Sequence, residues 1–165
     1  MKNLRKIFFA LILTTALIMS SACSAREQTF TCDYFSISLK GKYEYKDDPD
    51  YVMCLTGDEV LFTSVILQKG SETDVFSSAE EYLKYSLYQI EHYGCTIETF
   101  KNDAITYLYT DYSFSYDSED YRVFVAAYEN EYFYLICSFT VKSAAYPDNI
   151  RNIKSAAESV IMKSK

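Results

Sequence analysis

The chain lacks tryptophan and contains little histidine, proline or glycine. Its 165 residues include one His, two Pro and four Gly. Histidine is the commonest metal ligand and the usual acid–base group near neutral pH, so a single His argues against a typical metalloenzyme. The low Gly and Pro content excludes collagen-like and low-complexity chains. We therefore expect a globular protein without a bound metal ion or cofactor.

The short motifs of several enzyme classes are also missing. The sequence has no G-x-S-x-G nucleophile elbow, no G-x-x-x-x-G-K-[ST] phosphate loop and no G-x-G-x-x-G dinucleotide loop. His92 and Cys95 are close in sequence, but Gly94 separates them and no third orienting residue is evident. Acidic clusters at 47–50 and 117–120 match no calcium loop and are typical of solvated turns. We expect no catalytic residue and a protein that is not an enzyme.

The first 22 residues have the layout of a secretory signal peptide. Three basic residues, Lys2, Arg5 and Lys6, precede an apolar run over 7–19, and small residues follow up to Ala22. The run is shorter than the ~20 residues that span a bilayer. Small residues ending in Cys23 resemble a bacterial lipobox. The resemblance implies that Cys23 is lipidated, becomes the mature N-terminus and anchors the protein to the extracytoplasmic face of the cell membrane. The alternative is plain cleavage near Ala22 or Ala25 and a secreted protein.

Charge argues against nucleic acid as a partner. The leader holds three of the 16 basic residues and none of the 23 acidic ones, so the cleaved chain has a net charge of −10. Such a surface does not bind phosphate backbones or an anionic membrane surface. The lipid must therefore hold the protein at the membrane.

Four cysteines follow Cys23, an even number that is typical of disulfides in exported chains. Their spacing matches no zinc pattern, and four cysteines allow three pairings. We consider Cys32–Cys54 the best candidate because these residues flank a predicted hairpin. The alternative is that the cysteines are buried small apolar side chains.

Apolar periodicity predicts seven strands and two helices. Helical spacing and a Ser78–Glu81 capping box predict a helix over 77–93, and Pro147 opens a second, C-terminal helix. The strands have apolar residues on both faces, which two amphipathic helices can cover. We therefore predict an α+β fold, an antiparallel sheet of six to seven strands sandwiched by two helices. The predicted strands are 34–39, 51–56, 60–67, 96–100, 105–116, 121–128 and 132–142.

This order resembles the Mog1/PsbP-like fold. The resemblance rests on the opening strand Phe35-Ser36-Ile37-Ser38-Leu39-Lys40-Gly41, the helix start Ser78-Ala79-Glu80-Glu81-Tyr82, the hairpin 123–140, and Ile150, Ile153 and Ser159 in the last helix. It implies an α/β/α sandwich and a non-enzymatic binding or assembly scaffold. It assigns no functional residue. We expect a leader at 1–22, a short spacer at 23–29 and a single domain at 30–165.

Tyrosine is the one residue type in excess, with 17 copies. Tyrosine suits recognition surfaces because it combines a large ring with a polar tip. One interpretation is an exposed face that binds a protein, a small molecule or a glycan; the other is a sheet face packed under a helix. The first makes the protein a scaffold for a cell-envelope partner, or alternatively a small-molecule or glycan-binding lipoprotein. The residues of this predicted face are Tyr107, Tyr109, Asp111, Tyr132 and Tyr134.

Overall fold

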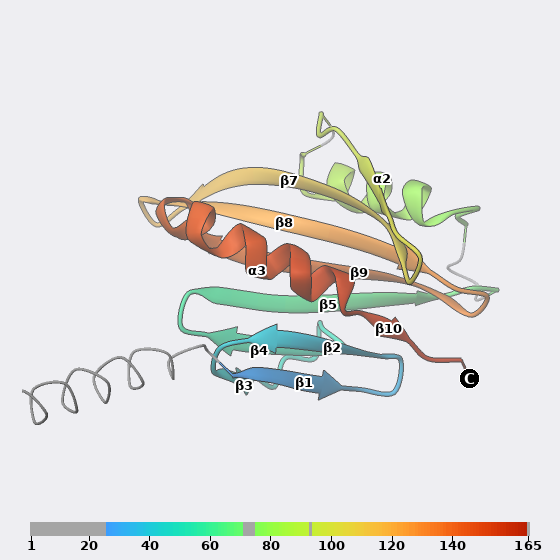
Figure 1. Ribbon diagram of the computed structural model, residues 1–165. Helices are drawn as coiled ribbons and strands as arrows, with labels where there is room; N and C mark the ends of the chain where they lie inside the picture. Colours follow the sequence, from blue (N-terminus) through green and yellow to red (C-terminus); the bar gives the residue numbers. More distant parts are fainter. Residues whose placement is uncertain (1–25, 71–74, 93, 165) are drawn as a thin grey trace, which may run out of the picture.

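A computed structural model describes residues 26–70, 75–92 and 94–164 of the chain (Figure 1). The predicted leader and the predicted lipidation site, Cys23, lie outside these residues. Within the described parts, no helix has the length and apolar character needed to cross a membrane.

The core of the fold is a seven-stranded antiparallel sheet with the order β3-β4-β5-β9-β8-β7-β6. Its central strands are the long apolar segments of the sequence. Side chains alternate between the two faces of each strand, so each face has its own apolar cluster. The strands are β3 (Tyr43–Tyr45), β4 (Met53–Gly57), β5 (Val60–Gln68), β6 (Glu98–Lys101), β7 (Thr106–Tyr116), β8 (Glu119–Glu129) and β9 (Phe133–Lys142).

One face of this sheet is covered by the helix α2 (Ala79–Gln89). Leu83 and Leu87 of the helix pack on Val123, Val125 and other side chains of β8 and β9. The helix contacts β8 and β9 and leaves part of this face uncovered.

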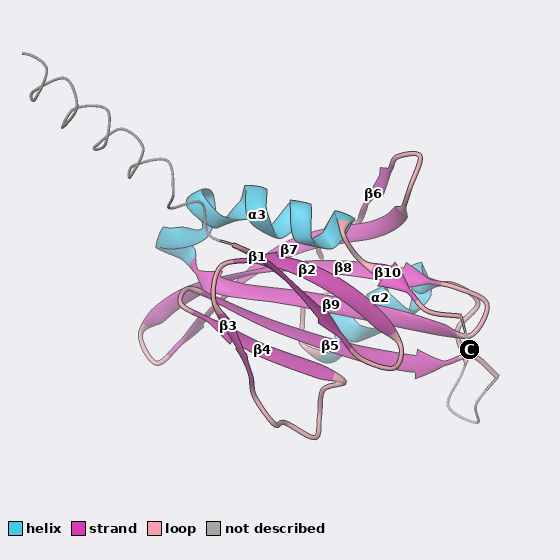
Figure 2. Ribbon diagram, turned by 60° about the horizontal axis from the view of Figure 1, so that its bottom comes forward, coloured by secondary structure: helices cyan, strands magenta, loops and turns pink. Residues whose placement is uncertain are grey.

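The opposite face is covered by two elements, the helix α3 (Tyr146–Glu158) and a small antiparallel sheet (Figures 1 and 2). This small sheet has the order β1-β2-β10, with β1 at Glu27–Thr31, β2 at Phe35–Lys40 and β10 at Ile161–Met162. The ring of Phe62 on β5 lies 5.1 Å from Phe139 on β9 and 6.5 Å from Phe35 on β2, centroid to centroid. The larger of the two cores therefore lies between the two sheets and α3.

The predicted fold class is confirmed, since two helices enclose an antiparallel sheet of seven strands. The small sheet was not predicted: its strands β1 and β10 are new, and the predicted strand 34–39 (β2) lies in it rather than in the large sheet. The seventh strand of the large sheet is β3, which was not predicted either. β1 also corrects the predicted domain boundary. It begins at Glu27, so residues 27–29 belong to the domain and not to a spacer, and they pair with β2 from Glu27↔Lys40 onward.

The helix α2 begins where the capping box predicted. The Oγ of Ser78 accepts a hydrogen bond from the Glu81 amide at 3.3 Å. The carboxylate of Glu81 accepts from Ser77, backbone and hydroxyl, at 2.8 and 2.9 Å, and these bonds lower its pKa. Two stabilised amides at the first turn fix the start of the helix.

The end of α2 differs from the prediction. The helix ends at Gln89 rather than at 93, and Glu91, not Gly94, adopts the left-handed conformation with φ 62°. The His92 amide donates to Leu87 O at 2.8 Å and the Glu91 amide to Tyr88 O at 3.1 Å, the pattern of a Schellman cap. The early turn moves His92 out of the helix and over the sheet.

Candidate functional site

The five residues of the predicted tyrosine face do not share one exposed surface. Tyr107 is buried and Tyr109 half-buried, both on the face of β7 that α3 covers. Asp111 lies on the same face and forms an ion pair with Arg122, whose guanidinium stacks 4.6 Å from the ring centre of Tyr146 on α3. For these residues the structure agrees with the second interpretation, a sheet face packed under a helix.

The side chains of the other two tyrosines, Tyr132 and Tyr134, also pack against neighbouring residues. Tyr132 packs at the edge of the core on the α3 side. Tyr134 is buried on the opposite face, where its hydroxyl donates to Phe76 O at 2.9 Å and its ring packs beside Tyr82. The prediction of one ligand or partner face at these residues is therefore wrong, because the sheet itself separates Tyr134 from Tyr107.

Buried tyrosines make the fold sensitive to alkaline pH. Burial raises the pKa of Tyr146 to about 12 and that of Tyr128 well above its ordinary value near 10. Above pH 10 the unfolded chain loses these protons while the folded protein keeps them, so stability is lost as pH rises through that window. We expect the free energy of unfolding to fall above pH 10, measured by urea denaturation across an alkaline pH series. In Tyr128→Phe the free energy of unfolding should fall less steeply with pH. An identical fall in the variant and the wild type would show that the tyrosine at position 128 does not contribute to the effect.

The predicted disulfide Cys32–Cys54 is not formed. All four described cysteines, Cys32, Cys54, Cys95 and Cys137, are free thiols. On β4, Cys54 alternates with Met53 and Leu55, which belong to the core between the sheets, so its side chain lies on the other face. Cys32 packs against that core, and the large sheet thus separates the two sulfurs. Burial raises the pKa of the Cys54 and Cys137 thiols, which disfavours the reactive thiolate.

Two of the five exposed tyrosines of the described residues, Tyr85 and Tyr88, lie on α2, and the other three, Tyr45, Tyr51 and Tyr116, lie elsewhere. We call these two tyrosines, together with Val75 before the helix and Ile90 just after it, the α2 patch. The exposed fractions of Val75, Tyr85, Tyr88 and Ile90 are 79%, 50%, 64% and 48%. The buried stripe of α2 is Ala79, Leu83 and Leu87, so the two tyrosines lie outside it. Aromatic residues off the apolar stripe of an amphipathic helix are a sequence signal that could have indicated this surface.

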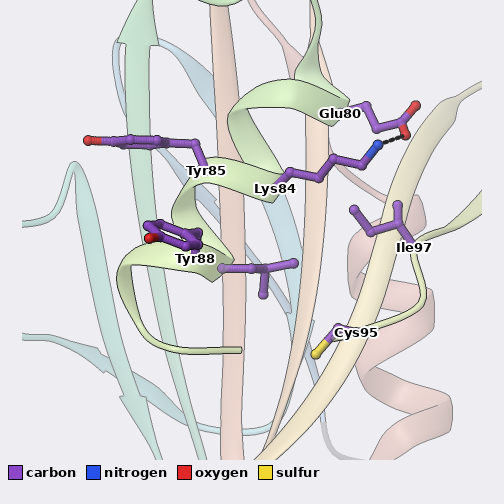
Figure 3. A pocket seen from close by; sticks show the side chains of 7 residues that line it. Glu80, Lys84, Tyr85, Tyr88, Cys95 and Ile97 are labelled. Carbon is purple, nitrogen blue, oxygen red and sulfur yellow. Dashed lines mark ion pairs between the residues drawn. The ribbon is translucent and has the colours of Figure 1, made fainter. Parts of the chain in front are cut away.

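Next to the α2 patch, a cleft of about 530 Å³ separates α2 from the segment leading into β6. Figure 3 shows the Glu80–Lys84 ion pair on the side of α2 that faces Ile97, and the rings of Tyr85 and Tyr88 on the other side. The ion pair has an N–O distance of 2.6 Å and is half exposed. The cleft thus combines aromatic rings with one internally neutralised ion pair. Its lining residues are Glu80, Lys84, Tyr85, Leu87, Tyr88, Cys95 and Ile97.

The described residues contain no cluster of metal-ligating side chains, and the histidine packs on the sheet. Over 26–70, 75–92 and 94–164, no three His, Cys, Asp or Glu side chains gather closely enough to hold a metal ion. The ring of His92 stacks on Tyr112 with centroids 4.1 Å apart and an interplanar angle of 26°.

Comparison with known proteins shows which solved structures have a similar fold. No known protein-family model matches the sequence, and no curated protein matches it. Among solved structures, cyanobacterial PsbP (CyanoP) from Synechocystis sp. PCC 6803 superimposes with a TM-score of 0.60 at 10% identity, covering 86% of this chain and 95% of that one. A protein from Bacteroides thetaiotaomicron VPI-5482 also gives a TM-score of 0.60, at 12% identity over 84% of this chain, and this chain spans about half its length, 49%. At these identities the likeness concerns the fold alone, and the chain has a PsbP-like fold.

Proposed function

We propose that the protein is a membrane-anchored lipoprotein on the extracytoplasmic face of the cell, and that it binds another cell-envelope protein without catalysing a reaction. The observation that carries the proposal is the α2 patch with its adjoining cleft. Tyrosine is enriched among the residues that dominate binding at protein interfaces.

The chemistry of the α2 patch supports a protein partner. Phe76 packs its ring 5.2 Å from Tyr85 and 5.3 Å from Tyr82, so the aromatic surface is preformed and loses little entropy on binding. The nearby charges of Glu80 and Lys84 neutralise each other. The cleaved chain has a net charge of −10. A surface of aromatic and aliphatic side chains on such a chain is typical of an interface centre, where charged residues are depleted.

The anchor proposal rests on the sequence, through the basic start, apolar run and small residues that end at Cys23. The position of β1 supports the geometry. It pairs with β2 in the small sheet, which covers the face of the large sheet opposite α2. An anchor on the N-terminal side of β1 is therefore compatible with a partner at the α2 patch.

Site-specific photo-crosslinking in native membranes tests the proposed surface. A photoreactive amino acid replaces Tyr88 in one variant and Tyr45, on the edge strand β3 and 61% exposed, in the matched control. We expect the position 88 variant to label one envelope protein, and Tyr85→Ala to lower the yield about tenfold or more. The control at position 45 should give no such product.

Two outcomes contradict the proposal. Either no adduct forms at position 88 above background, or positions 45 and 88 give the same products. Cys23→Ala tests the anchor separately: the protein should leave the membrane fraction, and if it stays there, lipid attachment at Cys23 is wrong.

A further inference from the structure

A second hollow lies on the other flank of α2, over the part of the sheet that the helix leaves open. Its volume is about 290 Å³, and we call it the side cavity. Leu83, Ser86 and Leu87 of α2 form one wall. It shares only Ile90 with the α2 patch and only Leu87 with the cleft beside that patch, so most of its lining is distinct from the proposed partner surface.

Strand register explains its floor. On β5 and β9, Thr63 pairs with Ser138, and Val65 pairs with Ile136. On β8 and β9, Val125 pairs with Ser138 and Val123 with Thr140. Paired residues lie on the same face of a sheet, so three hydroxyl groups and a set of small branched side chains form one continuous surface.

The lining separates into an apolar part and a hydroxyl part. Val123, Val125 and Ile136 are at most 5% exposed, whereas Thr63, Ser138 and Thr140 are half-buried. In the described part of the chain, no side-chain hydrogen bond engages these three hydroxyls. A ligand in the cavity can therefore bury an apolar body and bond to the hydroxyls with one polar end.

No charged side chain is present among the residues that line the side cavity, although the chain has 39 charged residues. An ionised ligand would lose hydration there without gaining a counter-charge. A sugar has hydroxyls on every edge, and several would face Val123, Val125 and Ile136 without partners. These walls favour an uncharged molecule with one polar end.

The size and walls of the cavity restrict the ligand further. Ligand pockets usually measure roughly 300–1,000 Å³, so 290 Å³ accommodates one ring or a short chain and not an oligosaccharide or a long acyl chain. Tyr51, Tyr112 and Phe114 line the cavity. Aromatic side chains favour stacking or edge contacts with another ring.

We propose that the side cavity binds a small uncharged molecule made of one apolar ring with a hydroxyl or carbonyl group at one end. The ring lies over Val123, Val125 and Ile136, and the polar group bonds to Thr63, Ser138 and Thr140. This site does not depend on a protein partner at the α2 patch.

Benzyl alcohol is the probe for this proposal, with benzoate and benzylamine as charged counterparts of the same ring. Methyl NMR spectra of the protein are recorded while each compound is added. We expect benzyl alcohol to shift the methyl signals of Val123, Val125 and Ile136 in a saturable manner, and the two ions to bind at least tenfold more weakly. The proposal is overturned if benzyl alcohol shifts none of these signals, or if the charged compounds bind equally well.

Two threonine variants test the polar end. Thr63→Val and Thr140→Val keep the side-chain shape and remove the hydroxyl, and together they should weaken benzyl alcohol binding about tenfold while toluene binding stays or improves. Thr56→Val is the matched control, because Thr56 is exposed on the same face but does not line the cavity. Equal effects of the control and the lining variants would contradict the assigned orientation.

Discussion

Replacing Phe62 with alanine is expected to lower the free energy of unfolding by about 3–5 kcal/mol. The side chain of Phe62 is 0% exposed. Its ring contacts Phe139 in the large sheet and Phe35 in the small sheet, so its removal opens a cavity between the layers that neither sheet can close alone. Urea denaturation followed by circular dichroism measures the loss.

Leu61→Ala is the matched control for this prediction. Leu61 is adjacent on β5, but its side chain lies on the opposite face and is 36% exposed. Its truncation removes less buried apolar surface and should cost less than about 1 kcal/mol. Similar losses for the two variants would contradict a core located between the sheets.

Ser159→Ala is expected to cost about 0.5–1.5 kcal/mol, the usual net contribution of an intramolecular hydrogen bond, because the hydrogen bond that it removes is part-buried. The Oγ of Ser159 accepts a hydrogen bond from the Ser38 amide at 2.9 Å. The same hydroxyl lies 2.7 Å from Ala156 O and 3.2 Å from Ser38 O, to which it can donate. One hydroxyl at the end of α3 therefore stabilises the backbone at the middle of β2.

Two measurements check this prediction. Urea denaturation gives the global loss, and hydrogen exchange should show faster exchange at the Ser38 amide. Ser155→Ala is the control, since Ser155 is exposed on the same helix and alanine favours helix formation. If the two variants have the same stability and the same Ser38 exchange rate, the assigned role of Ser159 is wrong.

The long elements of this fold were predictable from sequence, and the short ones were not. The segment at β5 is a nine-residue strand of mostly apolar residues, and the start of α2 carries its own capping signal. In contrast, β10 has two residues and β3 has three. β10 pairs with the distant strand β2, and β3 pairs with β4 across a loop. No local pattern of two or three residues identifies such a partner.

The tyrosine face shows a second limit of sequence reasoning. Alternation places Tyr107 and Tyr109 on one face of β7, which the structure agrees with. Alternation along β7 does not show which side chains of β9 share that face, because this depends on the register between the strands. In the structure, Tyr109 pairs with Ala126 of β8, and Glu129 of β8 pairs with Tyr134. Ala126 and Glu129 are an odd number of residues apart on β8, so Tyr109 and Tyr134 lie on opposite faces. The helix that covers each face is likewise decided by tertiary packing.

The two ends of the domain pair with each other in the small sheet. This pairing affects which part of the domain can form last during folding. β2 pairs with β10 from Ser36↔Ile161, and the Lys163 amide donates to Tyr34 O at 2.8 Å. Ser38 and Ser159 are 121 residues apart, so these contacts close one of the longest loops in the chain, which slows folding. Because a chain is synthesised N-terminus first, the layer over this core can be completed only after residues 161–163 have been made.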